Sequence, residues 1–227
     1  VDSVIFYKPT IEETTSETFI DSRDGNEYNW VQIGYQVWMA ENLAYLPSVN
    51  MVADGSEDAA GSYYYVYGYD GTNVAEAKAT DNYATYGVLY NWTAAMDGEA
   101  SSTTNPSGIQ GVCPAGWHLP SDAEWTELTD YLGGTSVAGG KLKETGTTHW
   151  ASPNTGATNE TGFTALPGGN RYDNGFFYVI GGNGDWWSAT EGSATSAWYR
   201  IMYTNGSNVS SLNYNKEVGF SVRCVRD

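Results

Sequence analysis

Alternation of apolar and polar residues predicts strands at both ends of the chain. Two extended runs flank Asp24-Gly25 within residues 19–34, which is the signature of a short hairpin, and residues 35–43 predict a further strand. Beyond residue 162, strand-like runs are separated by Gly, Asn and Ser. They read GFTALPGGNR, GFFYVI, GDWWSATE, SAWYRIMYT, NVSSLNYN and GFSVRCVR.

Helical spacing is confined to the middle of the chain. Leu89, Trp92 and Met96 repeat at helical intervals, so a short helix is predicted there, ending at Gly98. Residues 137–146 predict another short helical piece. The intervening region 49–83 is rich in Gly, Asp and Tyr and predicts irregular structure packed by aromatic rings.

The best-defined helix start is Ser121, which is followed three positions later by Glu124 and so forms a capping-box signature. An apolar stripe continues from it, and Gly133-Gly134 ends the helix. The stripe consists of Trp125, Leu128 and Leu132. Helices first and an antiparallel, Asn/Gly-turned sheet last predict an α+β fold.

Charge narrows the range of partners. The 227 residues include 10 Lys+Arg against 27 Asp+Glu, a net charge of −17, which argues against nucleic acid because phosphate binding rests on Lys and Arg. No apolar run approaches the about 20 residues that cross a bilayer, so no membrane insertion by this segment is expected. The Gly-, Asn- and Ser-rich composition is typical of an extracellular or outer-surface protein. Residues 1–17 predict a polar tether and residues 18–227 one domain.

The two cysteines, Cys113 and Cys224, belong to no C-x-x-C pair, which excludes a zinc ribbon. In an oxidising compartment they favour one disulfide; the alternative is two free, buried thiols. Alternation along the last strand places Phe220, Val222 and Cys224 on one apolar face, which favours a structural cysteine.

Catalytic patterns are weak. His118 and His149 belong to no metal-binding His pair, and a Cys113–His118 nucleophile pair is disfavoured if Cys113 is bonded. Glu124 lies in the first turn of a predicted helix, where negative charge suits the helix dipole. We therefore expect His118 and Glu124 to be structural. A carboxylate pair of a glycosidase stays open as an alternative.

Calcium is the one cofactor that the sequence predicts. Four loops, DSRDGNEY, GYDGTN, RYDNG and NGDW, supply the oxygen ligands that calcium prefers. The alternative is that Asp, Asn and Gly make turns there. The carboxylates predicted as metal ligands are Asp21, Asp24, Asp173 and Asp185.

The binding face is predicted on the C-terminal third, around residues 171–177 and between 198 and 214. Polar and aromatic residues alternate there, so one side of a hairpin faces solvent, and the Asn205-Gly206 turn lies in water. The predicted ligand-binding residues are Arg171, Tyr172, Asp173, Asn174, Phe177, Trp198, Tyr199, Tyr203, Asn205 and Tyr214. The alternative is that the tyrosines cover the core. Of Trp186 and Trp187, one is expected in the core and the other nearer the surface.

Several long motifs occur in an order that resembles the Fibrobacter succinogenes major paralogous domain. They are DSRDGNEYNWVQIGYQVWMAENL, YGVLYNWTAAM, CPAGWHLPSDAEWTEL, GGKLKETG, GFTALPGGNR, WWSATE and GFSVRCVRD. The resemblance spans residues 18–227, and that family occurs in Fibrobacter and Bacteroidetes surface and secreted proteins. It implies a C-type lectin-like fold of the formylglycine-generating-enzyme branch, with small twisted sheets, two main helices and long loops.

The resemblance also implies a function. Formylglycine-generating enzymes use a cysteine pair near the C-terminus, where this chain has only Cys224, and sulfoxide synthases use a His cluster that two isolated His cannot supply. The implied function is a non-catalytic surface module that binds an extracellular glycan or protein ligand. The alternatives are a structural subunit of a surface assembly or filament, and a glycan-acting or degenerate formylglycine-generating-type enzyme.

Overall fold

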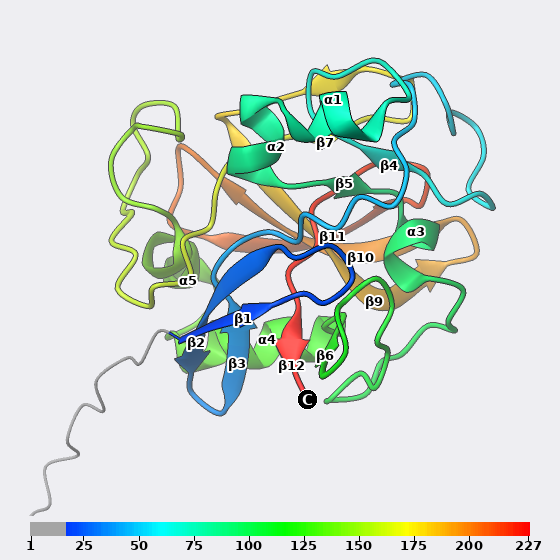
Figure 1. Cartoon of the computed structure of the whole chain (residues 1–227). Helices are drawn as coiled ribbons and strands as arrows, with labels where there is room; N and C mark the ends of the chain where they lie inside the picture. The colour runs from blue at the N-terminus through cyan, green and yellow to red at the C-terminus, as the bar shows by residue number, and fades with distance from the viewer. Residues whose placement is uncertain (1–16) are drawn as a thin grey trace, which may run out of the picture.

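The computed structural model describes residues 17–227, which form an α+β fold built around two main sheets (Figure 1). The larger sheet has five antiparallel strands in the order β1-β2-β3-β12-β6. They are β1 (Glu17–Ile20), β2 (Glu27–Ile33), β3 (Gln36–Met39), β6 (Trp117–His118) and β12 (Val225–Arg226). The last strand of the chain therefore lies in the sheet that begins at β1. Apart from Glu17, the predicted tether of residues 1–17 lies outside the described residues.

The second sheet has fewer but longer strands, in the order β11-β10-β9. Its strands are β9 (Asn183–Ser193), β10 (Ser196–Tyr203) and β11 (Val209–Asn215). Their antiparallel register places Tyr199 between Trp187 and Leu212. Two two-stranded sheets pair β4 (Tyr64–Tyr65) with β5 (Leu89–Tyr90) and β7 (Asn170–Arg171) with β8 (Phe177–Tyr178). The predicted hairpin at Asp24-Gly25 and the late antiparallel sheet are confirmed.

Helix α4 (Asp122–Tyr131) lies behind the five-stranded sheet in Figure 1 and begins as predicted. Ser121 Oγ accepts the backbone N–H of Glu124 at 3.2 Å, and the Glu124 carboxylate accepts the N–H of Ser121 at 2.9 Å. This is the reciprocal capping box. Helix α5 (Thr135–Leu142) covers most of the second predicted helical piece.

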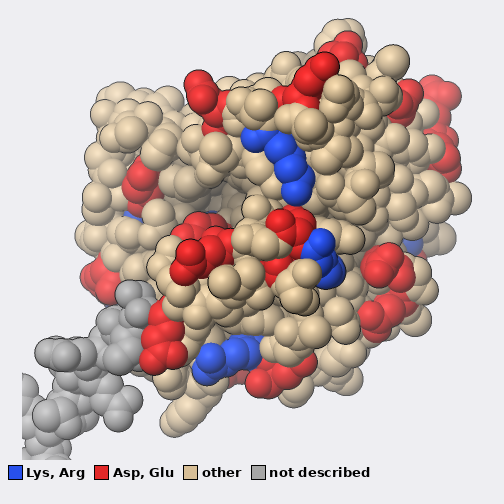
Figure 2. Space-filling view, in the orientation of Figure 1, with Lys and Arg blue, Asp and Glu red and all other residues tan. Residues whose placement is uncertain are grey.

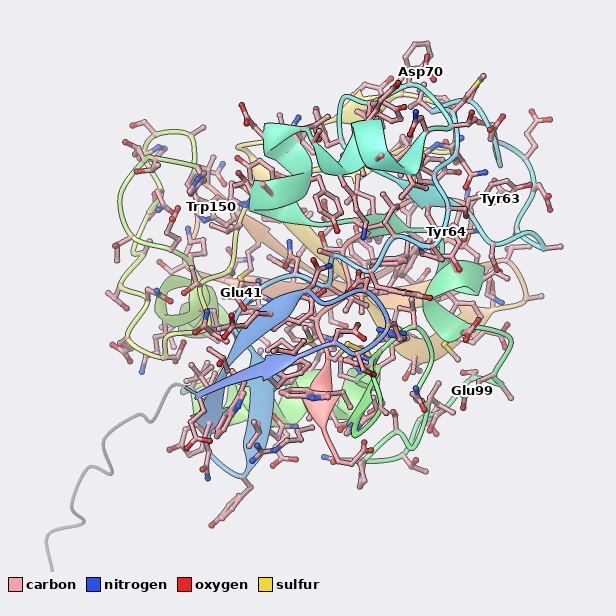
Figure 3. The ribbon with its side chains drawn as sticks, viewed as in Figure 1. Glu41, Tyr63, Tyr64, Asp70, Glu99 and Trp150 are labelled. Carbon is pink, nitrogen blue, oxygen red and sulfur yellow. A yellow bond between two sulfur atoms is a disulfide. The ribbon has the colours of Figure 1, made fainter. Side chains whose placement is uncertain are left out.

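The prediction of irregular structure for residues 49–83 was partly wrong. The region contains α1 (Val74–Lys78) and the start of α2 (Asp81–Tyr86), each only one or two turns long. Their N-caps are Asn73 and Thr80, whose side chains accept backbone N–H groups of the first turn. Aromatic packing was predicted correctly: the rings of Tyr63 and Tyr65 stack at 6.5 Å, and the ring of Tyr64 meets that of Tyr90 edge to face at 5.8 Å (Tyr63 and Tyr64 are labelled in Figure 3).

The helix predicted from Leu89 begins three residues later. Leu89 lies in β5, and α3 (Trp92–Met96) starts only after Asn91, whose side chain accepts the backbone N–H of Ala94 at 3.0 Å. An Asn at the cap position fixes the start because it satisfies a helix N–H that has no intrahelical partner.

The tryptophan prediction was also wrong, since Trp186 and Trp187 are both fully buried. The strand is covered on both faces: Trp187 packs against Tyr199 and Phe220 in one apolar cluster, and Trp186 against Trp125 in a second. Neither indole is therefore available to stack on a ligand.

Alternation likewise fails over residues 220–225, all of which are buried. Arg223 lies inside, where its guanidinium donates to the carbonyl oxygens of Phe163 and Thr164 and to Asn42 Oδ1. Burial lowers the pKa of Arg223 to about 9. A strand with both faces covered carries no alternation for the sequence to reveal. Among residues 17–227, no helix is long and apolar enough to cross a bilayer.

Candidate functional site

The Cys-His-acid segment that precedes α4 is fully engaged in structural contacts. His118 Nε2 lies 2.6 Å from Glu124 Oε1, and its Nδ1 lies 2.8 Å from Asp227 Oδ1. Burial lowers the pKa of His118, but the hydrogen bonds and charges of the two carboxylates outweigh it and raise the pKa above its ordinary value. Glu124 also accepts the backbone N–H of Ser107 at 3.0 Å. These groups therefore hold the loops around α4 together.

Cys113 and Cys224 are joined in a disulfide, as predicted. The bond links the loop before β6 to the segment before β12, and both cysteines are fully buried in the first apolar cluster. A bonded sulfur is not a resting nucleophile.

Two of the carboxylates predicted to bind calcium lie in the first hairpin turn. Asp21 is paired with Arg23, with Nη2 and Oδ2 2.7 Å apart. Asp24 accepts the backbone N–H of Asn26 at 3.1 Å, and the Lys78 ammonium lies 3.4 Å from its Oδ2. Both carboxylates thus already have hydrogen-bond donors within the turn or from a neighbouring helix.

The other two predicted calcium ligands differ in burial. Asp173 is partly exposed and accepts the side-chain amide of Asn215 at 3.0 Å. Asp185 is 1% exposed and accepts the amide of Asn170 at 3.1 Å. Within residues 17–227, no three His, Cys, Asp or Glu side chains gather in an arrangement suited to a metal ion. Calcium binding stays a prediction.

Arg171 was predicted to bind ligand, but its side chain is completely buried. The guanidinium donates to the carbonyl oxygens of Val52 at 2.8 Å, Asp54 at 2.6 Å and Glu217 at 3.2 Å, and lies 4.6 Å from the centre of the Tyr65 ring. It fastens the hairpin β7–β8 to the loop at residues 52–56 and is not accessible from solvent.

The structure brings several other predicted residues together at the tip of this hairpin. The hydroxyls of Tyr172 and Tyr214 are hydrogen-bonded, and their ring centres lie 5.2 Å apart. Tyr178 meets Tyr172 edge to face at 5.7 Å, and Asn174 donates to the Tyr178 hydroxyl at 2.9 Å. Across the turn, Tyr172 donates its backbone N–H to Phe176. We call Tyr172, Phe176, Tyr178 and Tyr214 the aromatic strip.

The aromatic strip is accessible from solvent. Phe176 is 63% and Tyr178 41% exposed, and Leu212, on the same face of β11 as Tyr214, is 42% exposed. Phe176 and Leu212 lie within the predicted ranges 171–177 and 198–214 but were not among the named binding residues, and Tyr178 lies outside those ranges. The signal was present in the run GFFYVI: consecutive aromatics beside a glycine in a two-stranded hairpin cannot all be covered.

The remaining predicted binding residues lie elsewhere or inside. Tyr199 is buried, Trp198 and Tyr203 are half-buried, and Phe177 packs on the ring of Tyr67 at 4.9 Å. Asn205 is exposed at the β10–β11 turn, as predicted. This turn lies at the opposite end of the hairpin from Tyr214, which pairs with Ala197. The predicted face therefore divides into two separate surfaces.

The charged side chains of this protein are mainly acidic. Figure 2 shows carboxylates spread over the visible face, with Lys and Arg confined to a few isolated spots. Such a surface repels polyanions, as expected from the net charge of −17.

Comparison with known protein families matches residues 31–226 to the Fibrobacter succinogenes major domain. Comparisons with curated proteins and with solved structures found no match. The family match extends from β2 through β12, so it includes the aromatic strip, the disulfide and the segment around α4.

Proposed function

Because the chain belongs to the Fibrobacter succinogenes major domain family, we propose that it is a non-catalytic binding or adhesion module that works at the cell exterior. Its ligand is an extracellular glycan or protein, bound on the C-terminal third. The aromatic strip carries the proposal, because it exposes Phe176 and Tyr178 on a hairpin that the buried Arg171 holds in place. Rigid, exposed aromatic rings bind at a low entropic cost.

The proposal that the module is non-catalytic is supported by the bonds and hydrogen bonds that its cysteines and histidines already make. Cys113 has no free thiol, and His118 has both ring nitrogens in contact with carboxylates. His149 lies 2.9 Å from Glu144 on a loop, with no cysteine or serine nucleophile among its hydrogen-bond partners in the described residues.

The proposed fold is C-type lectin-like. Three features of residues 17–227 support it: β12 lies in the same sheet as β1, α4 and α5 are the longest helices, and long loops separate short strands. The disulfide supports the proposed location at the cell exterior, because such bonds persist in oxidising surroundings.

An array of polysaccharides, cell-surface glycans and extracellular proteins, probed with and without calcium, tests the proposal. We expect saturable binding to a component of the array and no new reducing ends. Release of reducing sugar during incubation would favour the enzyme alternative. Loss of binding on chelation would place calcium in the site.

A further inference from the structure

Strand β11 forms an open edge of the second sheet. It pairs with β10 on one side only, and within residues 17–227 its backbone makes no other hydrogen bond between Val209 and Tyr214. The opposite edge, β9, is continued by bridges at Gly184 and Trp186. Every second residue of an edge strand directs an unpaired N–H and C=O outward, so β11 presents a row of unused backbone groups.

Helix α5 packs against the start of β11, where Val209 is buried, but the rest of the edge lacks the usual protection. Natural edge strands carry charges, proline or bulges that prevent pairing, but the β11 sequence VSSLNYN has none of these residues. The exposed Leu212 lies at the centre of this uncharged strand.

The charges that surround β11 are complementary to a neutral or basic partner. The nearby basic side chains, Arg200 and Lys216, are buried and paired with acids. Asp122, which contacts Ser211, is the partner of Arg200, whereas Asp173, which accepts the side-chain amide of Asn215, is partly exposed and forms no ion pair within residues 17–227. A second copy of this chain would bring the same acidic flanks and a further net charge of −17, which opposes self-pairing.

The free edge is continuous with the aromatic strip. Leu212 and Tyr214 point to the same face of β11, and the Tyr214 hydroxyl is bonded to Tyr172 on the adjoining hairpin. A strand added to β11 would therefore place every second side chain on this exposed apolar surface.

We propose that β11 binds a neutral or basic, extended peptide segment of an extracellular partner by strand addition. The segment continues the β11-β10-β9 sheet through main-chain hydrogen bonds, and its alternate side chains contact Leu212, Tyr214 and the rest of the aromatic strip. This inference rests on the proposed binding function and names the class of ligand. Backbone pairing gives affinity and the side-chain contacts give selectivity.

A random 12-residue peptide library, selected on the folded protein alone and then measured for binding to Leu212→Lys, provides the test. The lysine of Leu212→Lys places a charge at the centre of β11, which should prevent a further strand from pairing there. Leu212→Thr is the matched control because threonine keeps strand propensity without charge. We expect peptides with alternating apolar positions and a net charge of zero or above. They should bind at least about tenfold more weakly to Leu212→Lys and within about twofold to Leu212→Thr.

Hydrogen exchange gives the second readout. A selected peptide should slow exchange of alternate amides of Val209–Asn215 at least about tenfold, and N-methylation of its alternate amides should abolish binding. Recovery only of peptides that ignore Leu212→Lys, or that protect no β11 amide, would overturn strand addition. A glycan that binds the aromatic strip without protecting β11 would overturn it as well, yet leave the proposed function standing. If neither ligand class binds, both proposals fail.

Discussion

At the scale of single residues, the most unusual environment belongs to Asp185. It is fully buried between β7 and β10, and burial raises the pKa of Asp185 to about 7 although the Asn170 amide donates to it. Asp185 Oδ1 and Asn170 Oδ1 have no hydrogen-bond partner within residues 17–227. Tyr199 and Tyr203 are the titratable neighbours from β10. A protonated carboxyl supplies the donor that these two oxygens lack.

Replacement by the neutral isostere therefore tests this interpretation. In the wild type, the contribution of the protonated Asp185 to the free energy of unfolding is fully present below its unfolded pKa of 3.8. This contribution is lost as the pH rises toward the folded pKa of about 7. The loss is at most about 4 kcal/mol, from about three pH units at about 1.4 kcal/mol each. Asp185→Asn should remove this component and be more stable than wild type at pH 8.

Urea unfolding of both proteins at pH 4, 6 and 8 makes the comparison. The quantity of interest is the difference between the two unfolding free energies, since it cancels groups that titrate identically in both. A difference that does not change with pH would contradict a protonated Asp185. A calcium ion held by Asp185 would reverse the sign, because it needs the ionised carboxylate.

Residue burial was the least predictable property from sequence. Asp185 and Arg171 are charged types that are rarely buried, and an Asp/Asn/Gly-rich loop normally lies in solvent. What buries them is the packing of distant segments: Arg171 meets carbonyls at residues 52 and 54, more than a hundred positions earlier. No local pattern encodes such a contact.

At the scale of elements, the start of α4 joins local and long-range order. Ser121 and Glu124 form the local cap, and Glu124 also reaches His118 on β6 and the loop at Ser107. The capping box could be predicted from the sequence because it depends on two residues that are three positions apart. The contacts with His118 and Ser107 depend on the tertiary fold and were not readable.

Glu124→Gln should destabilise the protein by about 3 kcal/mol, the low end of the cost of breaking a buried, charged pair. The stability that His118 contributes is fully present below its ordinary pKa of 6.5 and is lost as the pH rises through its raised folded pKa. The defect should therefore be larger at pH 6 than at pH 9. Urea unfolding at both values measures it, with the partly exposed Glu127→Gln on the same helix as control. Equal losses at both pH values would contradict a charged His118.

Loops in this molecule are held by buried basic side chains. Lys143 is fully buried, and its ammonium donates to the carbonyl oxygens of Thr155 at 3.1 Å, Tyr203 at 3.0 Å and Gly206 at 2.8 Å. Burial lowers the pKa of Lys143 to about 8. It lies 5.1 Å from the ring of Trp150, on the left of Figure 3. Long loops thus gain order through cations that the chain itself supplies.

At the scale of the whole molecule, one covalent bond joins two segments that are far apart in the sequence, the loop before β6 and the segment before β12. The Cys113–Cys224 disulfide spans 111 positions, and in the chain-entropy model so long a loop stabilises by about 4–5 kcal/mol. The α+β class and this pairing were predictable, because strand periodicity, helix caps and two cysteines suffice. The division into two apolar clusters was not, since Trp186 and Trp187 direct adjacent side chains into different cores.

Reduction should lower the melting temperature by about 8–20 °C, since about 4–5 kcal/mol is lost at about 2–4 °C per kcal/mol for a domain of this size. Calorimetry of the oxidised and reduced protein measures this, and Cys113→Ala with Cys224→Ala separates loss of the bond from effects of the reductant. In denaturant without reductant, no cysteine should be alkylated. Modification of two thiols would contradict the bond.

The central claim is that the exposed aromatic strip, and not a buried residue, binds the extracellular ligand. The direct measurement is binding of Phe176→Ala/Tyr178→Ala to the array component that the wild type recognises, with melting temperature recorded in parallel and the buried Tyr199→Ala as comparator. We predict that binding by the double variant falls at least about tenfold, while its melting temperature stays within about 2 °C of wild type; Tyr199→Ala should instead lose about 3 kcal/mol or more of stability. Unchanged binding by the folded double variant would contradict the claim.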